Sequence, residues 1–424
     1  MSRKIDGGLA SGATASDATI SGEDHSVGAI ARATDEMAPW LVGVRRALHQ
    51  IPEPGNEEVE TADFLCATLT NLRIPFERQG TAIVAVVRGD RPGRVIGLRA
   101  DIDGLPLLEP DGLPFVSRHK GYMHACGHDA HMATALGTAK YFAAHTGTLT
   151  GSVKFLFQPA EETTGGAESM IARGCLENPH VDAIVGLHVM PYLQAGKIEL
   201  KHGALNGSSD YLRIVVRGKS GHAAYPETAI DAIMIAGKVL DALHTVVSRA
   251  VSPLEEAVIT IGTIEGGTKN NIIADEVKMA GTIRTTNPQV RASVARAVSA
   301  IATELPKAFG GSGEAEIIPG YTALINHDWV VDRLATVAGD FIGADAIQWK
   351  AKPSLGVEDF SFFLQKTPGA FYHLGCGRAG SANAPLHSKD FAIDEACLPL
   401  GVRLNIGLVY SLLASGGEKT DAPL

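Results

Sequence analysis

The spacing of hydrophobic and polar positions divides the chain into segments of different character. Residues 36–72 show a helical period that is interrupted at 51–55. Short, nearly continuous apolar runs follow, which predict strands covered on both faces. The predicted strands are 82–88, 94–100, 152–158 and 183–188, and a helix is predicted at 129–145 with Asp129 as its N-cap. Strands that alternate with helices indicate an α/β layered domain.

The pattern changes after about residue 206 and changes back after about residue 320. The elements predicted between them are strand 211–216, helix 227–247, strands 257–264 and 276–284, a helix from Asn287 to about 309, and strand 314–318. This β-α-β-β-α-β order is that of the ferredoxin-like arrangement. Further helices are predicted near 328–341 and 395–413. We therefore predict a disordered tail at 1–27, a large α/β domain in two parts, 28–205 and 321–424, and a smaller α+β domain inserted at 206–320.

Composition and charge restrict the class of protein. A length of 424 residues suggests two or three domains, at roughly 150 residues each. No apolar run reaches the ~20 residues of a membrane span, so we expect no membrane partner. The 47 acidic and 37 basic residues give a net charge of −10, which argues against nucleic-acid binding. Five scattered cysteines suit a reducing compartment, and residues 1–27 lack the apolar core of a secretory signal, so we expect a cytoplasmic protein.

Ionisable residues gather where predicted strands end, which is where open α/β sheets place functional groups. These residues are Asp101 and Asp103 after one strand, Glu161 and Glu162 after the next, and His188 at the end of a third. The densest polar cluster is 124–131, which reads His-Ala-Cys-Gly-His-Asp-Ala-His and directly precedes a predicted helix. Thiolate, imidazole and carboxylate ligands together suit Zn²⁺ and related ions such as Mn²⁺, Co²⁺ or Ni²⁺.

Two of these clusters admit a second interpretation. One carboxylate of Glu161-Glu162 could coordinate a metal while the other accepts a proton from metal-bound water, whose pKa falls to around 7. Alternatively, both carboxylates are exposed at a helix start, where the helix dipole favours them. Cys126 and His128 could be a thiol nucleophile and its base, as in a cysteine hydrolase. That alternative leaves the glutamate pair and the distant histidines without a role.

Several segments together resemble the M20 metallopeptidase family, and most closely its amidohydrolase branch of hippurate and auxin-conjugate hydrolases. The resemblance extends from about Trp40 to Leu408. The segments that carry it are 45–49 with Pro52-Glu53, 99–103, 123–129, 157–162, 186–189, 221–226, 281–284, 358–360 and 386–387.

The resemblance implies a zinc-peptidase-like α/β catalytic domain with an inserted ferredoxin-like α+β dimerisation or lid domain, in a homodimer or higher homo-oligomer. It also implies two divalent metal ions, with zinc, manganese, cobalt and nickel as candidates. The implied metal ligands are Cys126, His128, Glu162, His188 and His387.

Other residues take roles in the chemistry by the same resemblance. Glu161 would be the general base and later the proton donor to the leaving amine. His222 would reach the active site of a neighbouring subunit and stabilise the oxyanion. Asn271 and Arg284 would bind the substrate carboxylate, which suits the bidentate guanidinium group.

The activity implied is hydrolysis of N-acyl amino acids, hippurate-like or other acyl or aryl conjugates, to a carboxylic acid and a free amino acid. The partner is then a small molecule, with no nucleic acid and no membrane. A dipeptidase or aminoacylase is the alternative within the family, whereas a cysteine hydrolase and a non-catalytic binding homologue are alternatives outside this chemistry. The chain departs from the family pattern at Ala274 and Ser388, where proline is usual, and both positions concern substrate-binding loops.

Overall fold

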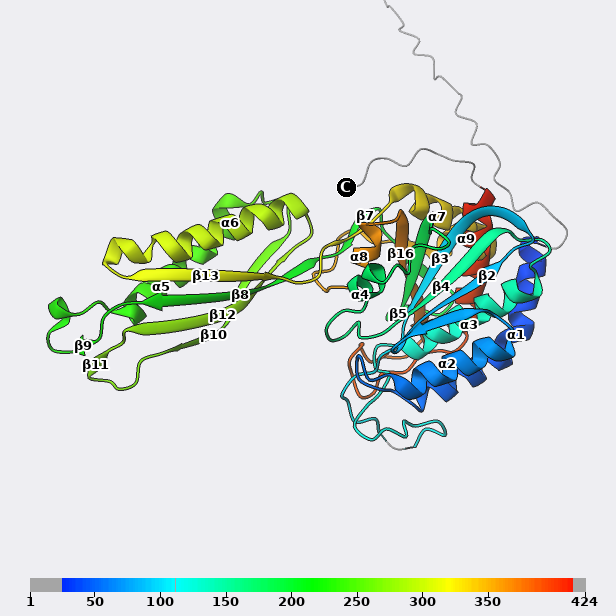
Figure 1. The fold of residues 1–424 in the computed structure, drawn as a ribbon, viewed down its shortest axis with the longest axis horizontal. Coiled ribbons are helices and arrows are strands. Elements are labelled where there is room, and N and C mark those ends of the chain that lie inside the picture. The colour runs from blue at the N-terminus through cyan, green and yellow to red at the C-terminus, as the bar shows by residue number, and fades with distance from the viewer. Residues whose placement is uncertain (1–24, 111, 415–424) are drawn as a thin grey trace, which may run out of the picture.

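The computed structural model describes residues 25–110 and 112–414, which form two bodies joined at one side (Figure 1). Within these residues the larger body contains an eight-stranded sheet in the order β1-β2-β4-β3-β5-β16-β6-β15. Its strands are β1 (Phe76–Gln79), β2 (Ala82–Arg88), β3 (Arg91–Asp101), β4 (Thr150–Gln158), β5 (Ala183–Gln194), β6 (Ile198–Leu200), β15 (Ile347–Trp349) and β16 (Gly369–Gly377). A short pair, β7 (Gly203–Asn206) and β14 (Leu324–Asn326), lies close to the junction.

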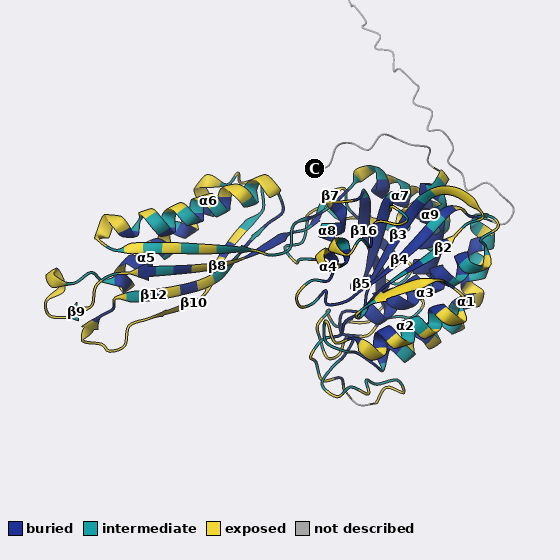
Figure 2. Cartoon of the chain, viewed as in Figure 1, coloured by how far each residue is buried: buried dark blue, intermediate teal, exposed yellow. Residues whose placement is uncertain are grey.

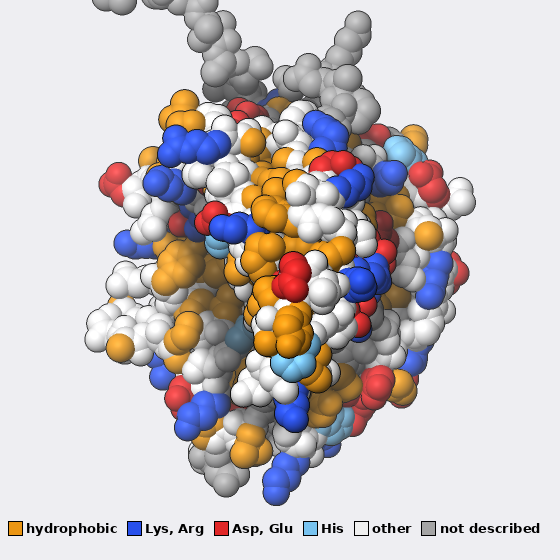
Figure 3. All heavy atoms as spheres, turned by 90° about the vertical axis from the view of Figure 1, so that its left-hand side faces the viewer, with side chains coloured by type: hydrophobic (Ala, Val, Ile, Leu, Met, Phe, Trp, Pro, Cys, Tyr) orange, Lys and Arg blue, Asp and Glu red, His pale blue; other side chains and the backbone are white. Residues whose placement is uncertain are grey.

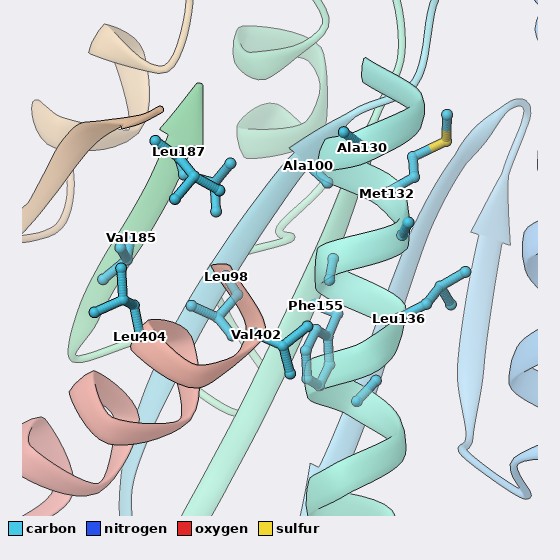
Figure 4. Packing of buried hydrophobic residues seen from close by; sticks show 14 of the residues in the cluster. Leu98, Ala100, Ala130, Met132, Leu136, Phe155, Val185, Leu187, Val402 and Leu404 are labelled. Atoms are coloured by element: carbon cyan, nitrogen blue, oxygen red, sulfur yellow. The ribbon is translucent and has the colours of Figure 1, made fainter. Parts of the chain in front are cut away.

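Helices cover both faces of the large sheet. They are α1 (Val27–His49), α2 (Val59–Asn71), α3 (His128–Ala144), α4 (Ala167–Ala172), α7 (Asp328–Ile342), α8 (Ser361–Leu364) and α9 (Cys397–Ala414). Helices α3 and α9 lie on the central strands, where Leu98, Phe155 and Val402 share one apolar core (Figure 4). On the opposite face, α4 and α8 pack through a second cluster that includes Met170 and Phe363.

Strand direction sets where functional groups gather. Strand β3 runs parallel to β4 and to β5, and β5 runs parallel to β16. The carboxyl ends of these four strands therefore lie at the same edge of the sheet. This is the edge at which the sequence places its ionisable residues.

The smaller body has its own sheet and its own core. Its elements are β8 (Ser208–Arg217), β9 (Gly221–His222), α5 (Ala232–Thr245), β10 (Ala257–Gly266), β11 (Ile272–Ile273), β12 (Glu276–Thr285), α6 (Pro288–Glu304) and β13 (Ser312–Pro319). The sheet order β10-β12-β8-β13 confirms the predicted ferredoxin-like arrangement. Ile214, Val239 and Val298 belong to an apolar cluster separate from that of the large sheet. Figure 2 shows this body buried along its inner surfaces and exposed on the outer faces of its helices.

The start of α3 differs from the prediction. The N-cap is Gly127, and Asp129 lies inside the first turn. The Asp129 carboxylate lies 2.6 Å from Arg45 Nε and 2.7 Å from His49 Nδ1, so long-range partners engage the side chain that was expected to cap the helix. Gly127 has a φ of 87°, and a Cβ there would lie 2.3 Å from Val189 Cγ2, so this turn requires glycine.

Two other helices begin at different positions from those expected. Helix α1 starts at Val27, about nine residues before the predicted start, with the Ser26 hydroxyl accepting a hydrogen bond from the Ala29 N–H. Helix α5 starts at Ala232, because residues 226–228 form a separate short turn. The predicted tail falls, up to residue 24, outside the described residues.

Helix α9 is strongly apolar. It is the one helix of the described ranges with the length and hydropathy of a membrane span. About 72% of its 18-residue window is buried inside the protein. The apolar surface of α9 therefore packs inside the core, against α1, α3 and α7.

Candidate metal centre and active site

A cavity of about 690 Å³ lies where the edge of the large sheet meets the smaller body. A second cavity, of about 810 Å³, is lined by residues such as Lys201, Thr286 and Lys366 and contains none of the predicted site residues. The predicted residues that line the first cavity are Cys126, Glu161, Glu162, His188, Arg284 and His387. The first cavity is therefore the candidate active site.

Five of the predicted residues bring their donor atoms together. Cys126, His128 and His188 form one group whose donor atoms lie within 4.8 Å of one another, and Cys126, Glu162 and His387 form a second such group. The Cys126 Sγ lies 3.3 Å from Nε2 of His188 and 3.3 Å from Nε2 of His387. Because the two groups share this sulfur, a bridging thiolate could serve two cations, each with three protein donors.

Hydrogen bonds behind these residues fix the direction of their donor atoms. The Nδ1–H of His128 donates to the Asp103 carbonyl oxygen at 2.9 Å, which leaves a buried Nε2 with no hydrogen-bond partner in the described chain. The Nδ1–H of His188 likewise donates to the Val189 carbonyl oxygen at 2.8 Å. Such bonds set the tautomer of metal-binding histidines. Since a buried, unpaired nitrogen is costly unless a ligand occupies it, the donor set fits divalent metal ions.

Two unusual backbone conformations hold the loops that carry these groups. Ala160, directly before the glutamate pair, has a φ of 60°, and its N–H donates to the Glu58 carboxylate at 2.8 Å. His387 has a φ of 59°, and its N–H donates to the Ala125 carbonyl oxygen at 2.9 Å. Positive φ is uncommon outside glycine and persists where surrounding bonds impose it. Both loops are therefore held in place by specific contacts.

Carboxylates gather around one buried arginine next to the cavity, which Glu161 and Glu358 line. The buried Arg99 guanidinium lies 2.7 Å from Asp101, 2.9 Å from Asp359 and 3.0 Å from Glu358. Burial, together with the charges of Glu358 and Asp359, raises the pKa of Glu161 well above its ordinary range. Burial also raises the pKa of Glu358 to about 8. In the metal-free chain, Glu161 therefore binds a proton more tightly than an exposed glutamate does.

The same excess of negative charge acts on the candidate metal ligands. Burial lowers the pKa of His128, but the charges of Asp101 and Asp103 more than offset it and bring that pKa to about 10. Burial and the charge of Glu162 raise the pKa of the Cys126 thiol well above its usual value. A divalent cation would reverse both effects, keeping the imidazole neutral and the sulfur ionised. These surroundings disfavour a free thiolate, which a cysteine hydrolase would need.

Two of the predicted site residues lie outside the cavity of their own chain. His222, in β9, and Asn271, directly before β11, are exposed, and β9 and β11 pair at the far end of the smaller body (Figure 1). Arg284, by contrast, lines the cavity, and its Nη1 donates to the Leu355 carbonyl oxygen at 2.8 Å. Asn271 and Arg284 therefore do not meet within one chain.

The prediction missed two residues that the structure places at this edge of the sheet. Arg99 lies within β3 and organises the carboxylates, and His373 lies within β16 and lines the cavity. His373 is the ionisable residue of an otherwise apolar, buried strand, and Arg99 lies in the buried carboxyl-terminal part of β3. That pattern is the signal by which both could have been found, because an ionisable group enters such a strand only with a partner.

Known proteins with similar sequences and structures agree with this geometry. Residues 97–411 match the model of peptidase family M20/M25/M40. N-acetyldiaminopimelate deacetylase of Priestia megaterium is 39% identical over 360 residues, which cover 84% of this chain and 95% of the relative. N-acetylcysteine deacetylase of Bacillus subtilis is 37% identical over 361 residues, covering 84% and 93%.

A solved structure extends the agreement to the fold. The Bacillus subtilis protein described as a dinuclear metal-binding peptidase of the M20 family superposes with a TM-score of 0.78, at 32% identity, over 89% of this chain and 99% of that one. Its similarity to these relatives shows that the chain is a metal-dependent hydrolase of amide bonds. It belongs to peptidase family M20/M25/M40.

Proposed function

We propose that this protein is a dinuclear amidohydrolase that cleaves N-acyl amino acids into a carboxylic acid and a free amino acid. The observation that carries the proposal is the pair of donor groups that share the Cys126 sulfur, beside Glu161 in a cavity that also contains Arg284. The deacetylase names of two relatives support an N-acyl amino acid as the substrate class. The proposed metal ligands are Cys126, His128, Glu162, His188 and His387, and the metals are zinc, manganese, cobalt or nickel.

Glu161 and Arg284 have different roles in the proposed hydrolysis. When bound, the metal ions polarise the acyl carbonyl and lower the pKa of water. Glu161 accepts the proton of the attacking water and donates it to the leaving nitrogen. Arg284 binds the carboxylate of the amino-acid part through its guanidinium group. Glu161 and Arg284 thereby select an amide bond that lies next to a carboxylate.

A second chain completes this proposed site. His222 and Asn271 are exposed at the far end of the smaller body, together with apolar side chains such as Ile264, which is 54% exposed, and Ile233, which is 52% exposed. Figure 3 views the molecule from this end and shows hydrophobic side chains gathered between charged ones. Such patches are typical of interaction surfaces. We therefore propose a homodimer in which His222 and Asn271 act in the partner's cavity.

A substrate panel with controlled metal content tests the proposed function. We expect the purified enzyme to hydrolyse N-acetyl amino acids, to lose this activity after exhaustive chelation, and to regain it with added Zn²⁺ or Mn²⁺. Hippurate and an unmodified dipeptide in the same panel separate an aryl-conjugate hydrolase and a dipeptidase from a deacylase. Activity that survives metal removal but is abolished by thiol alkylation would instead identify a cysteine hydrolase.

Asp103→Asn is expected to weaken metal binding by roughly 10- to 100-fold. One Asp103 oxygen accepts the Glu162 N–H at 3.0 Å and so positions that ligand. The other lies 3.2 Å from His128 Nδ1, whose proton goes to the Asp103 carbonyl oxygen, and it places negative charge beside this second ligand. Competition with a chromophoric chelator measures the affinity. Asp332→Asn, at a carboxylate that is 67% exposed, is the matched control and should bind metal as the wild type does. Equal affinities in all three proteins would show that the Asp103 carboxylate does not support the metal site.

A further inference from the structure

The cavity wall contains another histidine that the proposed function leaves without a role. His373 on β16 pairs in register with His188 on β5, and paired residues of neighbouring strands project from the same face of a sheet. His373 lines the 690 Å³ cavity, as His188 does. Among the described residues, no cluster of closely spaced metal donors includes His373. It therefore lies beside the proposed metal ligands without being one of them.

A buried carboxylate fixes the orientation of this ring. Glu199 Oε1 accepts hydrogen bonds from His373 Nδ1–H at 2.8 Å, from Lys350 Nζ at 2.9 Å and from the Tyr192 hydroxyl at 2.6 Å. His373 is 2% exposed and Glu199 is 8% exposed, so the pair is held inside the protein. Because Lys350 balances the charge of Glu199, the imidazole is neutral with its proton on Nδ1. The other nitrogen, Nε2, is then a hydrogen-bond acceptor, and it makes no hydrogen bond to any other described residue.

The order of strands indicates which part of the substrate His373 meets, and this step rests on the proposed function. Glu161 follows β4 and protonates the leaving nitrogen, so the amino-acid part of the substrate lies on the β4 side. The sheet order β4-β3-β5-β16 places His188 between Glu161 and His373. The acyl group, on the other side of the scissile bond, therefore extends toward His373.

We infer that His373 is a specificity-determining residue for the acyl group, whose Nε2 accepts a hydrogen bond from a hydroxyl or amino group on that part of the substrate. Hydroxyacyl and aminoacyl substrates are then preferred over alkanoyl substrates of the same size. The preference arises because an alkyl group in the same place leaves the acceptor desolvated and unpaired.

The N-glycolyl and N-propionyl derivatives of one amino acid test this inference, because they differ only by a hydroxyl in place of a methyl group. We expect the wild type to favour the glycolyl substrate by about tenfold in kcat/KM. In His373→Asn the amide nitrogen can still donate to Glu199, but no atom reaches the position of Nε2, so the ratio should fall to about one. His373→Gln places an amide group near that position and should keep part of the preference.

The matched control is Tyr192→Phe. Tyr192 donates a hydrogen bond to Glu199 but does not line the cavity, so this variant removes one bond to Glu199 without changing the cavity lining. This variant should keep the wild-type ratio. Because the ratio compares two substrates in one preparation, it does not depend on the amount of folded enzyme. His373→Phe is a second variant without an acceptor, so the test does not rely on the folding of His373→Asn alone.

Two results would overturn the inference: a wild-type ratio near one, or a ratio that both acceptor-free variants leave unchanged. A failure of the proposed function looks different, because the wild type would then hydrolyse neither substrate in a metal-dependent way. A ratio that falls in His373→Asn and His373→Phe, but not in Tyr192→Phe, supports the inference.

Discussion

Glu161→Gln is expected to lower kcat by about 10³- to 10⁴-fold while the protein keeps its full complement of metal. The amide has nearly the shape of the carboxylate but cannot accept the proton of the attacking water or return it to the leaving nitrogen. The proposed metal ligands are other side chains, so their donor atoms stay in place. The measurements are steady-state kinetics on an N-acetyl amino acid and metal analysis of the same preparation.

Glu168→Gln is the matched control for this variant, because Glu168 is exposed in the first turn of α4. It should have wild-type kcat and metal content. If Glu161→Gln also kept a kcat near that of the wild type, Glu161 would not be the base. Loss of metal together with activity would instead place Glu161 among the ligands.

Thermal unfolding provides an independent check on Glu161→Gln. Burial and the charges of Glu358 and Asp359 raise the pKa of Glu161, so its ionised form is destabilised in the folded protein. A neutral amide removes that repulsion. In the metal-free proteins, the variant should therefore unfold at the same temperature as the wild type or at a higher one, because residues selected for activity often reduce stability. A marked decrease would show that the low turnover reflects a damaged fold.

Strand ends in the sequence grouped four of the five proposed ligands: Cys126, His128, Glu162 and His188. His387 was implied only by the family resemblance, since it is 261 positions from Cys126, although their donor atoms lie 3.3 Å from each other. Parallel strands bring their carboxyl ends to one edge, so ligand-type residues after successive strands could be grouped before the fold was known. The ferredoxin-like body was predictable for a similar reason, because its hydrophobic period changes at both ends of the insertion.

Contacts between distant residues account for what the sequence did not reveal. Asp129 has the local character of an N-cap, but Arg45 and His49, about 80 positions earlier in the chain, engage its carboxylate. His373 depends on Glu199, which is 174 positions away in the sequence. Neither partner can be identified from local propensity, since a single ionisable residue in an apolar strand does not indicate which residue pairs with it.

His222→Ala is expected to lower kcat by about 10²- to 10³-fold, as the loss of one oxyanion-stabilising donor does. Within one chain His222 is exposed and lies outside the cavity, so the proposed effect requires that it act on the partner subunit. Kinetics of the variant homodimer measure this loss. His244→Ala, at a histidine on the exposed side of α5, is the matched control and should retain wild-type turnover.

Mixed dimers of His222→Ala with Glu161→Gln separate action across the dimer from action within one chain. In a dimer with one chain of each kind, the chain that keeps Glu161 receives His222 from its partner, whereas the other cavity lacks both groups. One complete site out of two should give about half of the wild-type activity per dimer, although each parent homodimer is nearly inactive. Co-expression with two affinity tags isolates the mixed dimer. If His222 acted within its own chain, each chain would lack one essential group and the mixed dimer would stay as inactive as its parents.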